Sequence, residues 1–288
     1  MTRPSLNLRQ PLPARRTGYP ADQGLIARRS LGPPGTPTPS VPDVIGGVPC
    51  VIVGQARNDA TVLHLHGGGY RMGCARDWVG FGNRLSRSTG ARVILPEYSL
   101  APERPFPGAL HDVIGLIGEL AGADEGKPII LSGDSAGGGL ALALASALAD
   151  PARLAGIILI SPWLDLRLIA DSYGRCAATD PIFSLAAAQA SATDYLQGWP
   201  AHDPLASPLL GELRGLPPIC LFASGAEVLA DDALDLVKRI GVDGAAISFS
   251  MLPGLLHDWP VVDPDRRETA FVFDLIEVFA RQVWSAVR

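Results

Sequence analysis

The chain has 288 residues, of which 47% are hydrophobic and 18% are charged, and its formal net charge is −5. This composition predicts a folded protein with a sizeable core. The mild charge, with no block of Lys or Arg beyond short pairs, argues against nucleic acid as a partner.

The first 42 residues form an arm rich in proline, arginine and glycine. We expect it to be either a loose arm or part of a cap over a site. It lacks the apolar stretch of a signal peptide, and the longest apolar stretch of the chain, residues 140–149, is too short to cross a bilayer. The four cysteines are widely spaced, which predicts reduced thiols without disulfides or metal. A soluble, cytoplasmic protein is therefore expected.

Beyond the arm, short apolar strands alternate with helices. Strands are expected at residues 43–46, 48–54, 61–66, 91–96, 128–132, 155–160, 219–223 and 245–251. Helices are expected at residues 77–88, 108–120, 136–149, 229–240 and 266–286. Most of the strands are continuous Val, Ile and Leu runs, so the pattern indicates an α/β fold: a mainly parallel, doubly wound sheet of about eight strands with helices on both faces.

Residues 164–208 interrupt this alternation with alanine-rich helical pieces and several prolines. We interpret them as a cap insertion. The core then consists of residues 43–163 and 209–288, and the arm of residues 1–42 could complete the cap.

The most informative stretch is Gly133-Asp134-Ser135-Ala136-Gly137, which joins an apolar strand directly to a helix. A Gly-x-Ser-x-Gly sequence in this context forms a sharp turn that presents the serine at the end of a strand. The following helix N-terminus favours negative charge on the reacting atom. We predict that Ser135 is a nucleophile.

A serine hydroxyl needs a neighbouring base, and where the nucleophile occupies such a turn the acid and the histidine follow it in the chain. Only His202 and His257 follow Ser135. His202 falls in the insertion, whereas His257 lies in a loop after the last strand, where open α/β sheets place their sites. We therefore predict His257 as the general base.

The acid is expected just after the strand at residues 219–223. Glu227 is the first carboxylate there, and it is our first choice. Asp231 and Asp232 follow one helical turn later and remain alternatives, although acids at a helix N-terminus are favoured by the helix dipole alone.

Glycines after the strand at residues 61–66 supply the remaining part of an acyl-transfer site. In His66-Gly67-Gly68-Gly69, residues without side chains allow backbone N–H groups to converge on one oxyanion. We predict that Gly68, Gly69 and Ala136 donate to it. A dinucleotide-binding glycine pattern is excluded because Met72 occupies the position of its third glycine.

These motifs together resemble the hormone-sensitive-lipase-like esterases of the α/β-hydrolase fold. The resemblance rests on the His66-Gly67-Gly68-Gly69-Tyr70 sequence, the segment from Glu97 to Glu103, the serine motif, Ser161-Pro162-Trp163 and the late His257. It implies hydrolysis of small carboxylic esters without cofactor or metal, by a monomer or a homodimer. Two departures are Glu227-Val228-Leu229, where many members have Asp-Pro-Leu, and Ser99 in place of an arginine.

The substrate is less well defined by the sequence. A neutral ester of a short-to-medium acyl chain fits the lack of a charge cluster near the motifs. The side chains of Tyr70, Trp78, Asp134 and Trp163 are candidates to line the pocket, and Asp134 alternatively anchors nearby loops. Rival functions are a lactonase, an amidase, a biosynthetic lyase or cyclase, and a non-catalytic small-molecule receptor.

Overall fold

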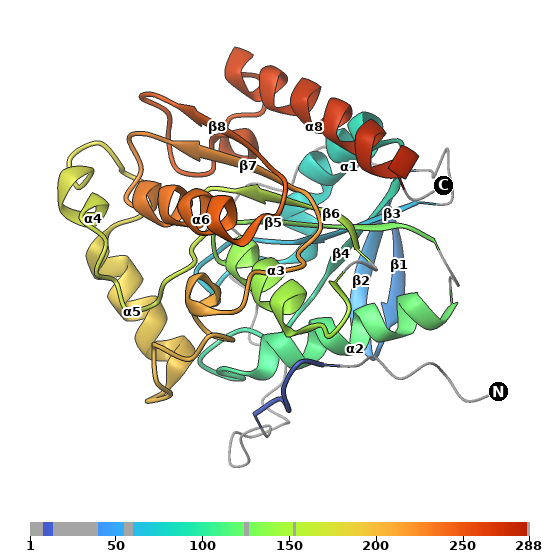
Figure 1. Cartoon of the computed structure of the whole chain (residues 1–288), viewed down its shortest axis with the longest axis horizontal. Coiled ribbons are helices and arrows are strands. Elements are labelled where there is room, and N and C mark those ends of the chain that lie inside the picture. Colours follow the sequence, from blue (N-terminus) through green and yellow to red (C-terminus); the bar gives the residue numbers. More distant parts are fainter. Residues whose placement is uncertain (1–7, 14–39, 55–59, 124–126, 152–153, 287–288) are drawn as a thin grey trace.

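The computed structural model describes residues 8–13, 40–54, 60–123, 127–151 and 154–286. Most of the 1–42 arm, residues 1–7 and 14–39, therefore lies outside the described residues. Within the described part, eight strands form one sheet with the order β1-β2-β4-β3-β5-β6-β7-β8 (Figure 1). The strands are β1 (Ser40–Ile45), β2 (Val48–Val53), β3 (Thr61–Leu65), β4 (Arg92–Pro96), β5 (Ile129–Asp134), β6 (Leu154–Ile160), β7 (Ile219–Ser224) and β8 (Ile247–Leu252).

Strand β2 runs antiparallel to both of its neighbours, β1 and β4, and all the other neighbouring pairs are parallel. The predicted α/β fold with a mainly parallel sheet is confirmed. The central strands β3, β5 and β6 are entirely buried, as expected for apolar runs covered on both faces. The edge strand β1 begins at Ser40, inside the stretch expected to be arm, and it includes Pro42. An edge position tolerates proline because one row of its backbone groups needs no partner strand.

Helices cover both faces of the sheet (Figure 1). Helices α1 and α8 pack on one face, and α2, α3 and α6 pack on the other. Their bounds are α1 (Val79–Thr89), α2 (Gly108–Ala123), α3 (Ser135–Ala147), α6 (Ala230–Asp243) and α8 (Arg267–Ala286). Each face has its own apolar core, one beneath α3 and the other beneath α8. Burial of this apolar surface is the main source of stability.

Shorter elements complete the chain. They are the 3-10 helices η1 (Ala75–Trp78) and η3 (Pro208–Leu210), and the helices α4 (Ser172–Arg175), α5 (Leu185–Leu196) and α7 (Trp259–Val262). Helix α7 was not expected from the sequence; Pro260, at its start, suits the first turn of a helix because the missing N–H needs no partner there. The helix expected at residues 136–149 begins at Ser135 and ends at Ala147.

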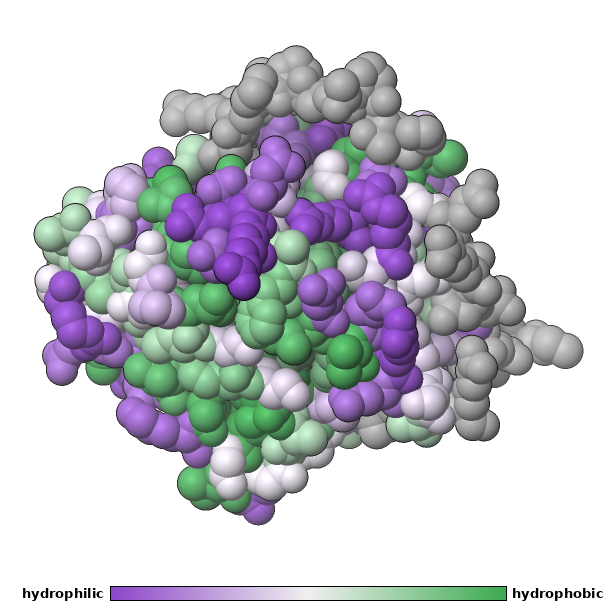
Figure 2. Space-filling view, turned by 90° about the horizontal axis from the view of Figure 1, so that it is seen from above, coloured by the Kyte–Doolittle hydropathy of each residue, from purple (hydrophilic) through white to green (hydrophobic). Residues whose placement is uncertain are grey.

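The face on the α8 side carries both hydrophilic and hydrophobic residues (Figure 2). Phe271 and Val278, one heptad apart on α8, are among the exposed apolar side chains. No helix in the described ranges is both long and apolar enough to span a bilayer.

Candidate active site

Ser135 stands at the junction of β5 and α3, at the carboxyl end of the central parallel strand. Its φ angle is +50°, in the left-handed region that non-glycine residues rarely adopt. The turn is held by Trp163, whose backbone N–H donates to the carbonyl of Ser135 at 2.9 Å. Gly137 lets α3 approach β3, because a Cβ there would lie 2.0 Å from the carbonyl oxygen of Leu65.

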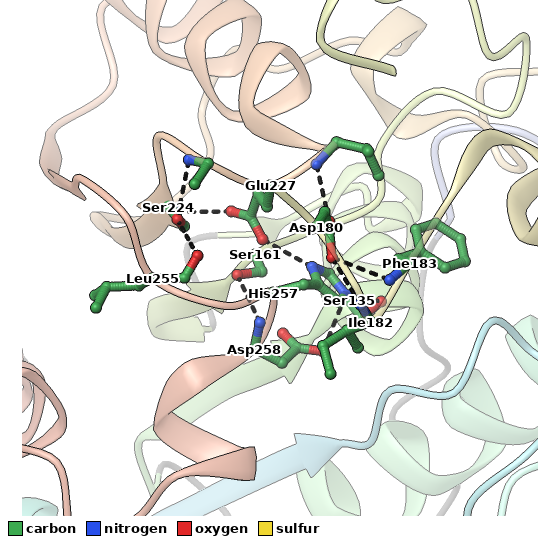
Figure 3. Close-up of polar contacts among 12 residues, drawn as sticks. Ser135, Ser161, Asp180, Ile182, Phe183, Ser224, Glu227, Leu255, His257 and Asp258 are labelled. Carbon is green, nitrogen blue, oxygen red and sulfur yellow. Dashed lines mark hydrogen bonds and ion pairs between the residues drawn. The ribbon is translucent and has the colours of Figure 1, made fainter. Parts of the chain in front are cut away.

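His257 lies in the loop between β8 and α7, and its imidazole meets the serine. Its Nε2 is 2.9 Å from Oγ of Ser135, and its Nδ1 is 2.7 Å from Oε2 of Glu227 (Figure 3). All three side chains are buried. The structure thus brings Ser135, His257 and Glu227 into one continuous hydrogen-bonded series, the arrangement that nucleophilic acyl transfer needs.

Glu227 is completely buried in the turn between β7 and α6. The backbone N–H of Ser224 donates to its second oxygen, Oε1, at 2.7 Å, so each carboxylate oxygen has a partner. The hydroxyl of Ser224 in turn donates to the carbonyl of Leu255 and links this turn to the loop that carries His257 (Figure 3). These bonds fix the carboxylate against the imidazole.

The two alternative acids, Asp231 and Asp232, form their contacts with residues of the insertion instead. Asp231 forms an ion pair with Arg175 and accepts the N–H of Ser172. Asp232 accepts the N–H groups of Leu164 and Asp165 at 2.7 and 3.1 Å. Neither of these carboxylates is brought to His257, and His202 is exposed.

The electrostatics of the histidine are governed by two carboxylates. Burial alone would lower the pKa of His257, but Asp258 and Glu227 outweigh it and raise this pKa well above its usual range. Oδ2 of Asp258 lies 3.2 Å from Nε2 of His257, on the nitrogen that faces Ser135.

The glycine loop after β3 runs beside the nucleophile. A Cβ on Gly67 would lie 3.2 Å from Cβ of Ser135 and 2.4 Å from Oδ2 of Asp134. Gly68 and Gly69 have φ angles of +110° and +61°, and the carbonyl of Gly68 accepts the N–H of Met72 at 3.0 Å. The loop is therefore held in a conformation that requires glycine, next to Ser135 and to the start of α3.

Asp134 and Trp78 hold this loop in place. One oxygen of Asp134 accepts the N–H of Gly67 at 3.0 Å, and the other accepts the indole N–H of Trp78 at 3.0 Å. His64 also faces Asp134, with Nε2 at 3.1 Å from Oδ1. The ring of His66 stacks on Tyr98. These contacts give Asp134 the anchoring arrangement that the sequence offered as its alternative to pocket lining.

The remaining predicted pocket residues, Tyr70 and Trp163, are buried together near the insertion. Their ring centroids are 6.0 Å apart, and Tyr70 stacks on Tyr195 of α5 at 3.8 Å. Burial raises the pKa of Tyr70 above its usual range. Trp163 meets the edge of Phe183 at 5.4 Å, and Phe183 stacks on the imidazole of His257 at 5.7 Å. Residues 164–208 thus contribute an aromatic wall that packs directly on His257.

The described part of the arm packs elsewhere. The N–H of Arg9 donates to the carbonyl of Ala147 at 2.8 Å, and its guanidinium donates to the carbonyls of Leu148 and Arg214. Ala147 ends α3, whereas Ser135 begins it, so these arm residues lie about 18 Å from the serine along the helix. Residues 14–39 lie outside the described residues.

The family of the chain follows from comparison with known sequences. Residues 62–261 match the profile of proteins with the alpha/beta hydrolase fold. The chain is an α/β hydrolase.

Relatives of this hydrolase are esterases of known sequence or structure. An acetyl-hydrolase of Streptomyces hygroscopicus is 35% identical over 251 residues, which cover 84% of this chain and 83% of the relative. An esterase of Acinetobacter venetianus is 32% identical and covers 72% of this chain and 70% of its own. The crystal structure of an esterase from the bacterial hormone-sensitive lipase family superposes with a TM-score of 0.78 at 32% identity, over 85% of this chain and 84% of that one. The predicted membership of the hormone-sensitive-lipase-like esterases is confirmed.

The hydrolase also contains site residues that the sequence analysis missed. Asp258 and Phe183 contact His257 directly. Asp180 accepts the N–H of Phe183 at 3.0 Å through one oxygen, and the N–H of Val228 at 2.9 Å through the other (Figure 3). Asp180-Pro181, a turn signal within the insertion, was the available clue to this wall. The adjacency of Asp258 to His257 was the clue to the second carboxylate.

Metal ligation has no support in the described residues of the hydrolase, where no group of three or more His, Cys, Asp or Glu side chains could hold an ion. The four cysteines all have free sulfurs, and burial raises the pKa of Cys50 and of Cys220 to about 12. These thiols are therefore protonated and poorly nucleophilic near neutral pH.

Proposed function

We propose that this hydrolase cleaves small, neutral carboxylic esters of short-to-medium acyl chains, with Ser135 as nucleophile, His257 as general base and Glu227 as its supporting acid. The class of enzyme, a serine carboxylesterase, follows from its family. The single observation that carries the residue roles is the buried series from Ser135 through His257 to Glu227, with contacts of 2.9 and 2.7 Å.

The reaction follows from the positions of these groups. Ser135 Oγ attacks the ester carbonyl while its proton passes to Nε2 of His257, and Glu227 stabilises the imidazolium at Nδ1. The tetrahedral oxyanion is held by the N–H groups of Gly68, Gly69 and Ala136. His257 then protonates the leaving alcohol. Water, activated by the same imidazole, cleaves the acyl-enzyme and regenerates the serine.

A preference for short acyl groups is supported by the enclosure of the site. Ser135 and His257 are 4% and 3% exposed, and Phe183 and Trp163 form an aromatic wall beside them. Two of the relatives bear the name acetyl-hydrolase. We also propose that residues 164–208 act as the cap, because α5 and Phe183 reach the site from this insertion.

The test is the rate of hydrolysis of p-nitrophenyl acetate, butyrate, octanoate and palmitate. We expect turnover that is fastest on the short esters and that falls by about 10⁴-fold or more in Ser135→Ala and His257→Ala. Ser285→Ala, on the exposed outer side of α8, and His202→Ala are the matched controls and should retain full rates. An active Ser135→Ala enzyme would refute the serine mechanism, and ligand binding without turnover would favour a receptor.

A further inference from the structure

A second carboxylate meets the histidine on its reactive nitrogen. Oδ2 of Asp258 lies 3.2 Å from Nε2 of His257, the nitrogen that is also 2.9 Å from Oγ of Ser135. The other nitrogen, Nδ1, is already 2.7 Å from Glu227. Both nitrogens of the imidazole therefore face carboxylate oxygens, whereas the proposed acyl transfer needs only the one at Nδ1.

The chain holds Asp258 firmly in this position. Its φ angle is +55°, a left-handed conformation that aspartate tolerates better than most residues. Its N–H donates to Oγ of Ser161 at 3.2 Å, and the residue is buried (Figure 3). Its other oxygen, Oδ1, has no hydrogen-bond partner within the described ranges. The contact with His257 is therefore the main polar interaction of this side chain. Such an arrangement is unusual, because buried carboxylate oxygens normally have hydrogen-bond partners.

This contact is favourable only when a proton lies between the two groups. With Nδ1 protonated toward Glu227, a neutral His257 has a lone pair at Nε2, which a carboxylate oxygen at 3.2 Å would repel. With a proton on Nε2 or on Asp258, the same contact becomes a hydrogen bond. That proton occupies the lone pair that must accept the proton of Ser135.

We propose that Asp258 is a positioning residue that retains a proton at Nε2 of His257 and so sets the pH below which the esterase is inactive. The inference rests on the proposed function, since it attributes the loss of that activity at low pH, the acid limb of its pH profile, to one side chain. Activation is the release of one proton from the His257–Asp258 pair to solvent. Nε2 then has a free lone pair, and Ser135 can transfer its proton to it.

The surrounding charges act in the same direction. The titratable groups that face the pair are Glu227, from the turn after β7, and Asp134, at the end of β5. Burial raises the pKa of Asp258 to about 7, although His257 acts to lower it and Asp134 adds to the rise. On the insertion side Phe183 covers the imidazole with an apolar ring. The neighbouring negative charge favours keeping a proton on the pair, and burial favours keeping it on the carboxyl of Asp258 although it acts against a charged imidazole.

The same carboxylate helps once the proton has left. The imidazolium that forms as Ser135 attacks is stabilised by Asp258 as well as by Glu227, so His257 is a stronger base than with one carboxylate alone. Removing Asp258 should therefore raise activity at low pH and reduce it at high pH. The profiles of variant and wild type should cross.

The test is kcat/KM for p-nitrophenyl acetate from about pH 5 to 9.5, a range that brackets ordinary and raised histidine pKa values. The variants are wild type, Asp258→Asn and Asp258→Gly. Asparagine keeps the volume, glycine removes the side chain, and both accept the positive φ angle. We expect the acid limb of both variants to move down by about one pH unit or more, because an opposite charge in contact shifts a pKa by that amount. The rate at which a fluorophosphonate labels Ser135 should shift in parallel.

The control is Asp263→Asn, which removes an acid of the same segment that is half-exposed and pairs with Arg266. Its acid limb should coincide with that of wild type. An unshifted limb in a folded Asp258→Asn or Asp258→Gly enzyme would overturn the inference while leaving the esterase mechanism intact. Full activity of Ser135→Ala would instead refute the mechanism itself, so the two failures are distinguishable.

Discussion

Glu227 and His257 are joined by a buried contact of 2.7 Å between Oε2 and Nδ1. Glu227→Gln keeps the shape but places a neutral amide against the imidazole, so the ring loses the charge that favours the required tautomer and stabilises the imidazolium. We expect kcat to fall by about 10³- to 10⁴-fold with little change in KM, as measured by steady-state hydrolysis of p-nitrophenyl acetate.

Asp231→Asn is the matched control for this substitution. It removes a carboxylate only one helical turn from Glu227, but one that pairs with the exposed Arg175. Exposed ion pairs contribute at most about 1 kcal/mol to stability, so both activity and melting temperature should stay close to wild type. If Asp231→Asn lost activity and Glu227→Gln did not, the assignment of the acid would be wrong.

The sequence predicted the framework of the site because its signals are local. Continuous apolar runs identified the parallel strands, and the glycines around Ser135 identified the turn at the end of β5. His257 and Glu227 could be placed from their order after the serine and from the ends of β7 and β8. In each case a residue's place relative to one strand was enough to suggest a role.

The missed residues depend on tertiary contacts between distant segments. Phe183 contacts His257 from a turn in which Asp180 accepts the N–H of Val228, 48 positions further along the chain. Asp258 faces Nε2 because its left-handed backbone is tied to Ser161. The periodicity of apolar residues in the sequence does not predict such contacts. Alanine-rich pieces with prolines also carry little pattern, so the sequence of residues 164–208 predicts an insertion but not the contacts that its side chains make.

The glycine loop offers a second prediction. Gly68 has a φ angle of +110°, and a Cβ there would lie 2.4 Å from the carbonyl oxygen of Met72. Gly68→Ala should therefore displace the loop and misplace a proposed oxyanion donor, which is worth on the order of 3 kcal/mol to the transition state. We expect kcat to fall on the order of 10²-fold, measured on enzyme shown to be folded by circular dichroism.

Gly80→Ala serves as its control. Gly80 lies on α1, where an added Cβ meets nothing within 4 Å. Alanine favours a helix over glycine by up to about 1 kcal/mol, so this variant should be fully active and slightly more stable. Wild-type kcat in a folded Gly68→Ala enzyme would argue against the oxyanion role of this loop.

Phe183 is expected to restrict the acyl or alcohol group of the substrate. Its ring lies between Trp163 and the imidazole of His257, at centroid distances of 5.4 and 5.7 Å. Phe183→Ala removes this wall and opens space beside the imidazole of His257. The ratio of kcat/KM for p-nitrophenyl octanoate to that for the acetate should rise on the order of tenfold, a change typical of altered apolar pockets.

Phe271→Ala tests whether loss of any aromatic ring has this effect. Phe271 is 46% exposed on α8, on the face of the sheet opposite α3. Its removal should leave the ratio at the wild-type value. An unchanged ratio in Phe183→Ala as well would mean that another part of the insertion limits the acyl chain.

Asp232 predicts a dependence of stability on pH. Burial raises the pKa of its carboxyl from the usual 3.8 to about 8, although two backbone N–H donors act to lower it. Between these values the folded protein retains a proton that the unfolded chain has released, so folding becomes less favourable as pH rises from about 4 to about 8. Asp232→Asn has no such proton. The melting temperature of the variant should therefore rise relative to that of wild type across this range. The difference in unfolding free energy between the two should change by on the order of 6 kcal/mol.

The pH dependence of the stability difference between Asp232→Asn and wild type distinguishes the effect of the proton from the effect of altered packing. A buried amide that replaces Asp232 changes stability by a constant amount at every pH, because it does not titrate. Only the titration of the wild-type carboxyl makes the stability difference between variant and wild type vary with pH. Asp274→Asn, an exposed change on α8, should show a constant gap between pH 5 and 8.5. A constant gap for Asp232→Asn too would mean that its carboxyl is ionised throughout, held by the N–H groups of Leu164 and Asp165.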